Sequence, residues 1–333
     1  MKCDVLIVSL GSTHGLRTAD EQLAQAIEAA GATVQLARAR APRPLRTLAA
    51  TDLAWALAAR RAARAALASG PPPRAIVYSS TTAALLWPMP GAVRFDATAA
   101  GNRPGRHGFW QRPLERRRLR AAPLLVPQAP GTLAESPSPH APAVVVPIPV
   151  EPSEAGPGAT RAGRDITAIT YAANPHKKGL DRVLAAWAAA RRGGEELVVA
   201  GTEHVPPAPG VRNAGRLAPA AYRALLRRAR VFVTAPRRED YGIAQLEALA
   251  DGAQLVTTPA PGPYAALPLA RELDARLVAD DLAPALRAAL QQPRADYAER
   301  AARALEPYGA AALRRRVSEE LLPRLLAAPA QLG

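Results

Sequence analysis

The chain has 333 residues, of which 49% are hydrophobic, and a formal net charge of +15, so it is long enough for two ordinary domains. Its single cysteine, Cys3, excludes an intramolecular disulfide and fits a reducing cytoplasm, and no stretch resembles a signal peptide or approaches the roughly 20 apolar residues of a membrane span. Only Lys2, Lys177 and Lys178 are lysines, so nearly all the positive charge comes from arginine. The chain is also rich in Ala, Pro and Gly, and this composition indicates a GC-rich gene. We therefore do not expect a nucleic-acid partner from the charge alone.

The chain opens with the pattern of a βαβ unit. An apolar strand is expected at residues 3–10, a helix with regularly spaced apolar residues at 18–30 and a second strand at 33–36, which together predict a parallel sheet. The loop after the first strand is bounded by glycines and contains Gly11, His14 and Gly15 as candidate ligand contacts. It lacks the G-x-G-x-x-G spacing of a dinucleotide site and also suits an ordinary βα turn.

Further elements complete a first open α/β domain. A helix is expected at 52–69, and β-branched runs predict strands at 74–78, 92–95, 124–126 and 144–146. Asp96 directly follows one of these strands, where a carboxylate could hold an acceptor hydroxyl or act as its base. The alternative is an Asx-type residue that opens the next loop.

The segment Arg112–Arg120 is strongly basic and is predicted to form a helix with little apolar face. Such a helix could dock on anionic lipid head groups or bind an anionic acceptor. It could equally be the solvated face of an arginine-rich protein.

One stretch, Pro147–Gly158, has the composition of a linker. Its density of proline and glycine prevents regular secondary structure, so we place the domain boundary inside it. The predicted organisation is a first domain at 1–148, a linker at 149–163, a second domain at 164–309 and a C-terminal segment at 310–333 that contains a final helix.

The second domain begins with a predicted strand at 166–171 and a helix at 180–192. The loop between them contains Asn174 and two of the three lysines, Lys177 and Lys178, which codon bias does not explain. A strand at 196–200 is closed by Gly201, and the segment 210–215, which ends at Gly215, is expected to be a turn.

The central motif follows an apolar strand at 231–234. A polar loop carries Glu239 and Asp240, and a helix starts near Gly242 and contains Glu247. The free N–H groups of the first helical turn suit a phosphate, whereas the two glutamates suit neutral sugar hydroxyls, because a carboxylate accepts strong hydrogen bonds from them. By spacing alone, the pair could also be one exposed loop acid and one helix acid.

The last part of the chain adds predicted strands at 254–257 and 276–278 and helices at 282–291, 296–305 and 310–326. There is no cluster of Cys and His, and the adjacent Asp280 and Asp281 suit a helix cap, so no metal ion is expected.

The block from Glu239 to Glu247 resembles the E-x7-E block of retaining glycosyltransferases with the GT-B fold, family 4 in the usual grouping. The segment Tyr171–Asp181 is similar to the strand–loop–Lys-Gly–helix segment of the same family. The resemblance covers the second half of the chain and, more faintly, the first. Three features depart from the family: Ala172 stands where an arginine usually assists the lysine, the region of Asp96 lacks the usual histidine, and residues 261–264 replace a loop that often reads Gly-Gly-x-x-Glu.

The resemblance implies two Rossmann-like open α/β domains that face each other across a cleft, with the final helix crossing back to the first domain. It implies that Lys178 and the N–H groups near Tyr241 and Gly242 stabilise a departing diphosphate, that Glu247 holds the ribose and that Glu239 holds the donor sugar. Asp96 would join Glu239 and Lys178 as a catalytic candidate. The loop with Gly11, His14 and Gly15 resembles the glycine-rich first loop of the family, which implies that it faces the acceptor and the donor phosphates. The remaining donor-binding candidates are Asp240, Lys177, Asn174, Gly201 and Gly215.

We therefore predict transfer of a hexose-like sugar from a nucleotide diphosphate sugar to a hydroxyl of a glycan, lipid-linked or small-molecule acceptor, with retention and without a cofactor or metal. The expected location is the cytoplasm, with peripheral contact to an anionic inner membrane face as a further expectation. Two alternatives stay open: another enzyme on this fold, such as a sugar-nucleotide epimerase or phosphorylase, and a non-catalytic basic protein that binds membrane or nucleic acid.

Overall fold

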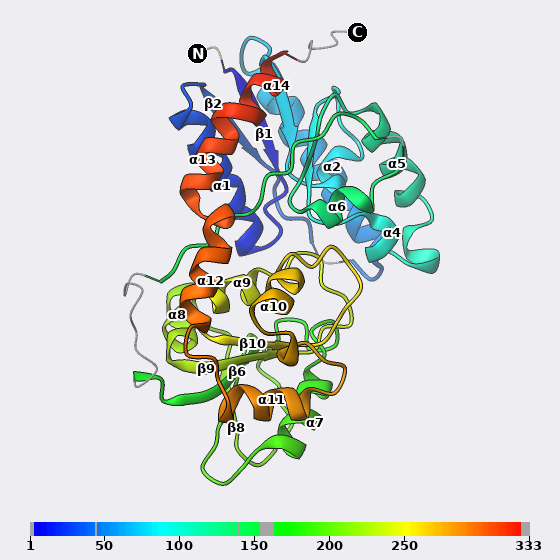
Figure 1. Cartoon of the computed structure of the whole chain (residues 1–333). Helices are drawn as coiled ribbons and strands as arrows, with labels where there is room; N and C mark the ends of the chain where they lie inside the picture. Colours follow the sequence, from blue (N-terminus) through cyan, green and yellow to red (C-terminus); the bar gives the residue numbers. More distant parts are fainter. Residues whose placement is uncertain (1–2, 44, 139, 154–162, 328–333) are drawn as a thin grey trace. The chain divides into compact units, whose positions relative to one another are not determined.

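The computed structural model describes residues 3–43, 45–138, 140–153 and 163–327 (Figure 1). The chain divides into two compact units: unit 1 comprises Met1–Pro149 with Ala310–Gly333, and unit 2 comprises Val150–Gly309. Most of the predicted linker, residues 154–162, lies outside the described residues. No described helix has the length and apolar character needed to cross a membrane.

Unit 1 is built on a five-stranded parallel sheet with the order β2-β1-β3-β4-β5. Its strands are β1 Val5–Ser9, β2 Val34–Arg38, β3 Ala75–Tyr78, β4 Ala92–Phe95 and β5 Leu125–Pro127. β1 is buried along its whole length, because helices cover both faces of the sheet. Val5 and Ile7 pack in one core cluster and Leu6 and Val8 in another, as the alternation of side chains along a strand requires.

The helices of unit 1 are α1 His14–Ala29, α2 Leu48–Ala68, α3 Thr81–Ala84, α4 Ala99–Asn102, the 3₁₀ helix Gly105–Gly108, α5 Gln111–Ala121 and α6 Pro130–Ala134. Leu23 and Ile27 of α1 join the cluster of Val5, whereas Ala59 and Ala63 of α2 join the cluster of Leu6. The side chains of Thr13 and Thr47 cap α1 and α2 by accepting from backbone N–H groups in the first turns.

The last helices of the chain belong to unit 1 and lie along α1 (Figure 1). They are α13 Ala310–Arg316 and α14 Leu322–Ala327, with the π-helical turn Val317–Leu321 between them. Leu313, Val317, Leu321 and Leu325 enter the same core cluster as Val5 and Ile7 of β1. The single helix expected at 310–326 is thus interrupted by a π turn.

Unit 2 contains a second five-stranded parallel sheet, with the order β10-β9-β6-β7-β8. Its strands are β6 Ile166–Tyr171, β7 Leu197–Ala200, β8 Val211–Gly215, β9 Ala229–Thr234 and β10 Gln254–Thr257. Its helices are α7 Leu180–Ala190, α8 Pro219–Arg228, α9 Ile243–Ala250, α10 Ala266–Asp274, α11 Leu282–Gln291 and α12 Tyr297–Leu305, with 3₁₀ turns at Ala275–Leu277 and Glu306–Tyr308. The predicted pair of open parallel α/β domains is confirmed.

Three local predictions are wrong. Residues 144–146 run beside β5, with Val144 donating to the Leu125 carbonyl at 2.9 Å, but Pro142 and Pro147 lack the N–H groups that a longer ladder needs. The expected strand at 276–278 is a 3₁₀ turn, since the Asp274 side chain accepts from the Arg276 N–H and caps it. The expected turn at 210–215 is the edge strand β8.

Candidate active site

The candidate site of unit 2 begins where β9 ends. The buried strand stops at Thr234, and α9 starts at Ile243 after Gly242, whose φ of 92° suits glycine alone among ordinary residues. The first-turn N–H groups of α9 therefore lie at the carboxyl end of the sheet, where open α/β sheets bind ligands. Tyr241 is buried, and its carbonyl accepts from the Ala265 N–H, so it secures the loop.

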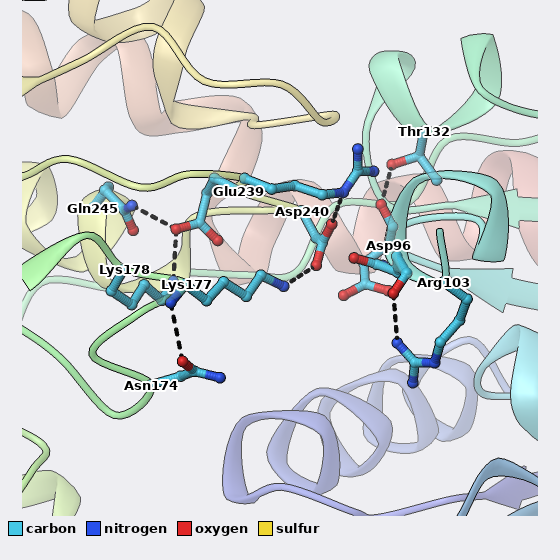
Figure 2. Close-up of polar contacts among 11 residues, drawn as sticks. Asp96, Arg103, Thr132, Asn174, Lys177, Lys178, Glu239, Asp240 and Gln245 are labelled. Carbon is cyan, nitrogen blue, oxygen red and sulfur yellow. Dashed lines mark hydrogen bonds and ion pairs between the residues drawn. The ribbon is translucent and has the colours of Figure 1, made fainter. Parts of the chain in front are cut away.

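Glu239 is the centre of a buried polar cluster. Its Oε2 accepts from Lys178 Nζ at 2.6 Å and from Gln245 Nε2 at 2.8 Å, as Figure 2 shows. The Glu239 side chain is 5% exposed and that of Lys178 is 20% exposed, so water screens this pair poorly.

A second ion cluster flanks the first. Asp240 pairs with Lys177 through one oxygen, and its other oxygen accepts from Arg238 Nε at 2.9 Å. Asn174 Oδ1 accepts from the Lys177 backbone N–H at 3.0 Å (Figure 2). The two clusters place the cations of one loop against the acids of the other.

Gly179 sets the close approach of these two loops. It precedes α7 with a φ of 64°, and an added Cβ would collide with the carbonyl oxygen of Ala235. The Arg237 N–H also donates to the Lys177 carbonyl at 2.9 Å. Because the loops touch at the backbone, Lys178 reaches Glu239 although the two are far apart in sequence.

A pocket of about 400 Å³ opens beside these loops in unit 2. It is lined by Tyr171, Ala173, Ala200, Gly201, Arg216, Leu217 and Tyr222. The rings of Tyr171 and Tyr222 stand 5.1 Å apart at 51° to each other. Gly201 lies on the pocket wall, and its N–H donates to the carbonyl of Gly215 at 2.8 Å, so both predicted glycines shape this region.

Glu247 lies near the tyrosine pocket, since its charge raises the pKa of both Tyr171 and Tyr222 in addition to their burial. Burial raises the pKa of Glu247 itself, and Arg223, whose Nη1 is 3.4 Å from Glu247 Oε1, opposes that rise. Arg223 also donates to both oxygens of Asp251 at 2.9 Å. Glu247 is therefore oriented by a guanidinium that Asp251 fixes.

The sequence did not single out Tyr171, Tyr222, Arg223 or Gln245. Tyr171 ends β6, and an aromatic residue at the carboxyl end of a parallel strand is a signal that could have been used. Arg223 gave no signal, because arginines occur throughout the chain. Gln245 lies inside the motif, two residues before Glu247, but its contact with Glu239 depends on the turn at Gly242.

Unit 1 has a candidate site at the carboxyl ends of β1, β3 and β4. A pocket of about 280 Å³ lies there, next to the point where the strand order reverses between β1 and β3. Its lining includes Leu10, Ser12, Leu16, Ser80, Thr81, Thr82, Asp96, Thr98 and Gln111. The predicted residue Asp96 is thus in the lining, and its carbonyl accepts from Thr132 Oγ1 at 2.7 Å (Figure 2).

The loop between Gly11 and Gly15 borders this pocket, but the lining atoms come from residues next to the predicted ones. Gly11 has a φ of 57° and accepts from Arg17 Nη1 at 2.9 Å, while Gly15 lies in the first turn of α1. Leu10, Ser12 and Leu16 provide the lining atoms. The side chain of His14 lies outside the described residues.

The floor of this pocket is polar. Asp52 accepts from Arg103 Nε at 2.6 Å and from Arg103 Nη2 at 3.0 Å. Gln111 is 2% exposed, and its Oε1 has no hydrogen-bond partner among the described atoms. Behind the lining, Glu115 accepts from the Ala99 N–H at 2.7 Å, and burial raises its pKa to about 7.

The buried Glu115 predicts a pH-dependent stability. Its pKa rises from 4.5 to about 7 on folding, so its contribution to stability is complete below pH 4.5 and is lost as the pH rises through 7. As the pH rises from about 5 to about 8, we expect the free energy of unfolding of Glu115→Gln to increase by about 2–3 kcal/mol relative to that of the wild type. Urea denaturation at both pH values measures this change, and parallel stability curves for the two proteins would contradict it.

Among residues 3–43, 45–138, 140–153 and 163–327, no three His, Cys, Asp or Glu side chains are grouped as metal ligands. The absence of a metal requirement stays a prediction.

Comparison with known proteins adds a family match for unit 2. Residues 165–293 match the family described as glycosyl transferases group 1. No curated protein sequence matches the chain.

Several solved structures share the fold. WaaG, a glycosyltransferase involved in lipopolysaccharide biosynthesis, superposes with a TM-score of 0.69 at 16% identity, over 95% of this chain and 98% of WaaG. Sucrose-phosphate synthase from Thermosynechococcus elongatus gives 0.66 at 17% identity, over 98% of this chain and 100% of that one. HepE from Anabaena, solved with UDP-glucose, gives 0.64 at 12% identity, over 96% and 99%.

The family match and the structural likeness agree with the topology of the two units. The matched range contains Lys178, Glu239 and Glu247, and each unit has the five-stranded parallel sheet of the structural neighbours. The chain therefore has the GT-B fold, and its residues 165–293 are similar to the family of glycosyl transferases group 1.

Proposed function

We propose that this protein transfers a sugar from a nucleotide diphosphate sugar to an acceptor hydroxyl, with retention of the anomeric configuration and without a metal ion. The observation that carries the proposal is the Lys178–Glu239–Gln245 cluster beside the N-terminus of α9, inside the range that matches the glycosyltransferase family. The complex of HepE with UDP-glucose supports a donor of this class.

In this proposal the departing diphosphate lies at the first turn of α9. The ammonium group of Lys178 then donates to the phosphate oxygens as well as to Glu239. The N–H groups after Gly242 stabilise the negative charge of the same diphosphate. Glu239, held by Gln245, accepts hydrogen bonds from donor-sugar hydroxyls. Glu247 holds the ribose, and the tyrosine pocket of Tyr171 and Tyr222 receives the base.

The acceptor in this proposal is a glycan, a lipid-linked sugar or a small molecule bound by unit 1. Asp96 contacts the acceptor hydroxyl, and the reaction passes through an oxocarbenium-like state as in other glycosyl transfers. The donor phosphate takes part in removing the hydroxyl proton, so the chemistry requires no base from the protein. We expect the protein to act in the cytoplasm.

The test is a thermal-shift screen against UDP, GDP, ADP and TDP, followed by product analysis with the nucleotide sugar that stabilises the protein. A ligand at one hundred times its Kd adds about 2.7 kcal/mol to the stability of the folded state. Acceptor-dependent formation of a glycoside with the donor's anomeric configuration supports the proposal. An altered sugar nucleotide formed without acceptor would indicate an epimerase instead.

The two glutamates should have separable effects. We expect Glu247→Ala to weaken nucleotide binding and Glu239→Ala mainly to lower turnover, each by about 1.5–3 kcal/mol, because each loses a charged hydrogen-bond partner of the donor. Titration with the nucleoside diphosphate and steady-state kinetics measure the two effects. Unchanged kinetics in both variants would refute the assignment of the site.

The basic helix α5 should bring the protein to anionic membranes. Of its arginines, Arg116, Arg117 and Arg120 are exposed and line one surface depression. Arg118 differs from them, since it donates to the Leu85 carbonyl at 2.9 Å and stacks on Trp87. Three arginines near an anionic surface contribute about 3 kcal/mol, so changing them to glutamine should abolish most sedimentation with anionic vesicles.

The control for this experiment removes the same charge elsewhere on unit 1. Arg61, Arg64 and Arg315 are also exposed, and their replacement by glutamine should leave most of the vesicle binding in place. Binding should fall steeply with salt, because screening shortens the reach of the charges. Equal sedimentation of the wild type and the α5 variant would rule out this surface.

A further inference from the structure

The unit 1 pocket has an unusual charge balance for this arginine-rich protein. Asp52 and Asp96 line it, and Arg103 is the one cation among the lining side chains that the structure describes. All three nitrogens of Arg103 already donate: Nε and Nη2 to Asp52, and Nη1 to the Asn102 carbonyl at 3.0 Å. The guanidinium is therefore committed to partners within the fold.

The ion pair between Asp52 and Arg103 is strengthened by its burial. The Asp52 side chain is 7% exposed and that of Arg103 is 26% exposed, and the pair is bidentate. An anion that drew Arg103 away from Asp52 would leave a buried carboxylate uncompensated, which is strongly unfavourable. Because Arg103 balances the charge of Asp52, Asp96 leaves the lining with a net negative charge, which also disfavours an anion.

The remaining polar atoms of the pocket favour a hydrogen-bond donor as ligand. Gln111 lines the pocket, is 2% exposed and leaves its Oε1 without a partner among the described atoms. A buried carbonyl oxygen without a partner is costly, so a ligand hydroxyl that donates to it is stabilised. A dianionic phosphate offers only acceptor oxygens to such an atom.

We infer that the unit 1 pocket binds an uncharged, hydroxyl-bearing sugar ring and discriminates against the phosphorylated form of the same sugar. This inference rests on the proposed function, because it names the class of the acceptor. The cavity volume of about 280 Å³ lies just below the usual range of about 300–1,000 Å³ for ligand pockets, which favours one ring over an extended glycan. The Asp52–Arg103 pair is the element that sets the discrimination.

The test measures binding without any donor. Methyl hexosides of the gluco, manno and galacto series and the corresponding hexose 6-phosphates are compared by saturation-transfer difference NMR on the full chain. We expect at least one neutral hexoside to bind about tenfold more tightly than its phosphate. Gln111→Leu should weaken the neutral sugar, which locates the binding in unit 1.

Freeing the arginine should reverse the selectivity. Asp52→Asn should raise affinity for the phosphate about tenfold, and adding Arg103→Gln should remove that gain. Tighter binding of phosphates by the wild type, binding of no neutral hexoside, or a folded Asp52→Asn variant with unchanged selectivity would overturn the inference. Should Asp52→Asn fail to fold, two measurements still test the inference: the ratio of the wild-type affinities for neutral hexoside and hexose phosphate, and the affinity of Gln111→Leu for the neutral hexoside.

The two proposals can fail separately. Selective binding of neutral hexosides without any sugar transfer would support the assignment of the pocket and refute the proposed activity. Sugar transfer only to phosphorylated acceptors would support the proposed activity and refute the assignment of the pocket.

Discussion

Replacing Lys178 with alanine is expected to lower kcat/KM for nucleotide-sugar turnover by about 10²–10³, the usual loss when one preorganised donor is removed from developing negative charge. Two effects combine at this position. The departing diphosphate loses its cation, and the buried Glu239, which is 5% exposed, loses the cation that compensates its charge while it keeps the hydrogen bond from Gln245. Steady-state kinetics with the nucleotide sugar identified by the thermal screen measures the change.

Lys177→Ala is the matched control, because it removes the same charge from the neighbouring position. Asp240 would retain its hydrogen bond from Arg238 Nε, so no buried acid is left alone. We expect a loss below about tenfold. Equal losses in the two variants would show that the loop contributes only general positive charge, and circular dichroism melting curves identify any variant that has lost its fold.

The second large effect is expected from Gly179→Ala. An alanine there must adopt a φ of 64° and place its Cβ against the carbonyl oxygen of Ala235, so either α7 or the loop after β9 must move. Steric overlap and backbone strain each cost about 1–3 kcal/mol, and we expect a loss of about 3–5 kcal/mol in the stability of unit 2. Calorimetric melting measures the loss.

Gly194 offers a control in the same unit. Its φ is 79°, but an added Cβ meets nothing within 4 Å, so Gly194→Ala carries the backbone strain without the collision. We expect this variant to lose about 1 kcal/mol. Equal melting temperatures of the two variants would show that the close contact between Gly179 and Ala235 does not contribute to stability. The difference between them isolates the cost of separating the two loops of the site.

Much of the fold could be predicted because its signals are local. The apolar runs of β1, β6 and β9 and the glycines at 242 and 252 mark strand and helix ends within a few residues of their observed places. The same motif brought Glu239 and Glu247 to the end of β9. The edge strand β8 was missed because its exposed polar residues, such as Arg212 and Asn213, carry no alternation of apolar side chains.

The rest of the site depends on long-range packing. The pairing of Tyr171 with Tyr222 joins the end of β6 to α8, and no local pattern links them. Both interpretations of the helix α5, as a docking surface or as a solvated face, treated its polar residues as exposed, yet Gln111 and Glu115 are buried with Leu119. Buried polar residues of this kind look like surface residues in a sequence, because hydrogen bonds rather than apolar character secure them.

The placement of the last helices has a consequence for the order of folding during synthesis. Unit 2 is continuous in the chain, whereas the core of unit 1 is completed by Leu313, Val317, Leu321 and Leu325. At about 5–20 residues per second, the face of β1 that carries Val5 and Ile7 waits roughly ten to thirty seconds for these side chains after Pro149 has been made. The unit that is synthesised first is therefore the one that finishes folding last, and part of its apolar core lacks its final cover until the last helices have been made.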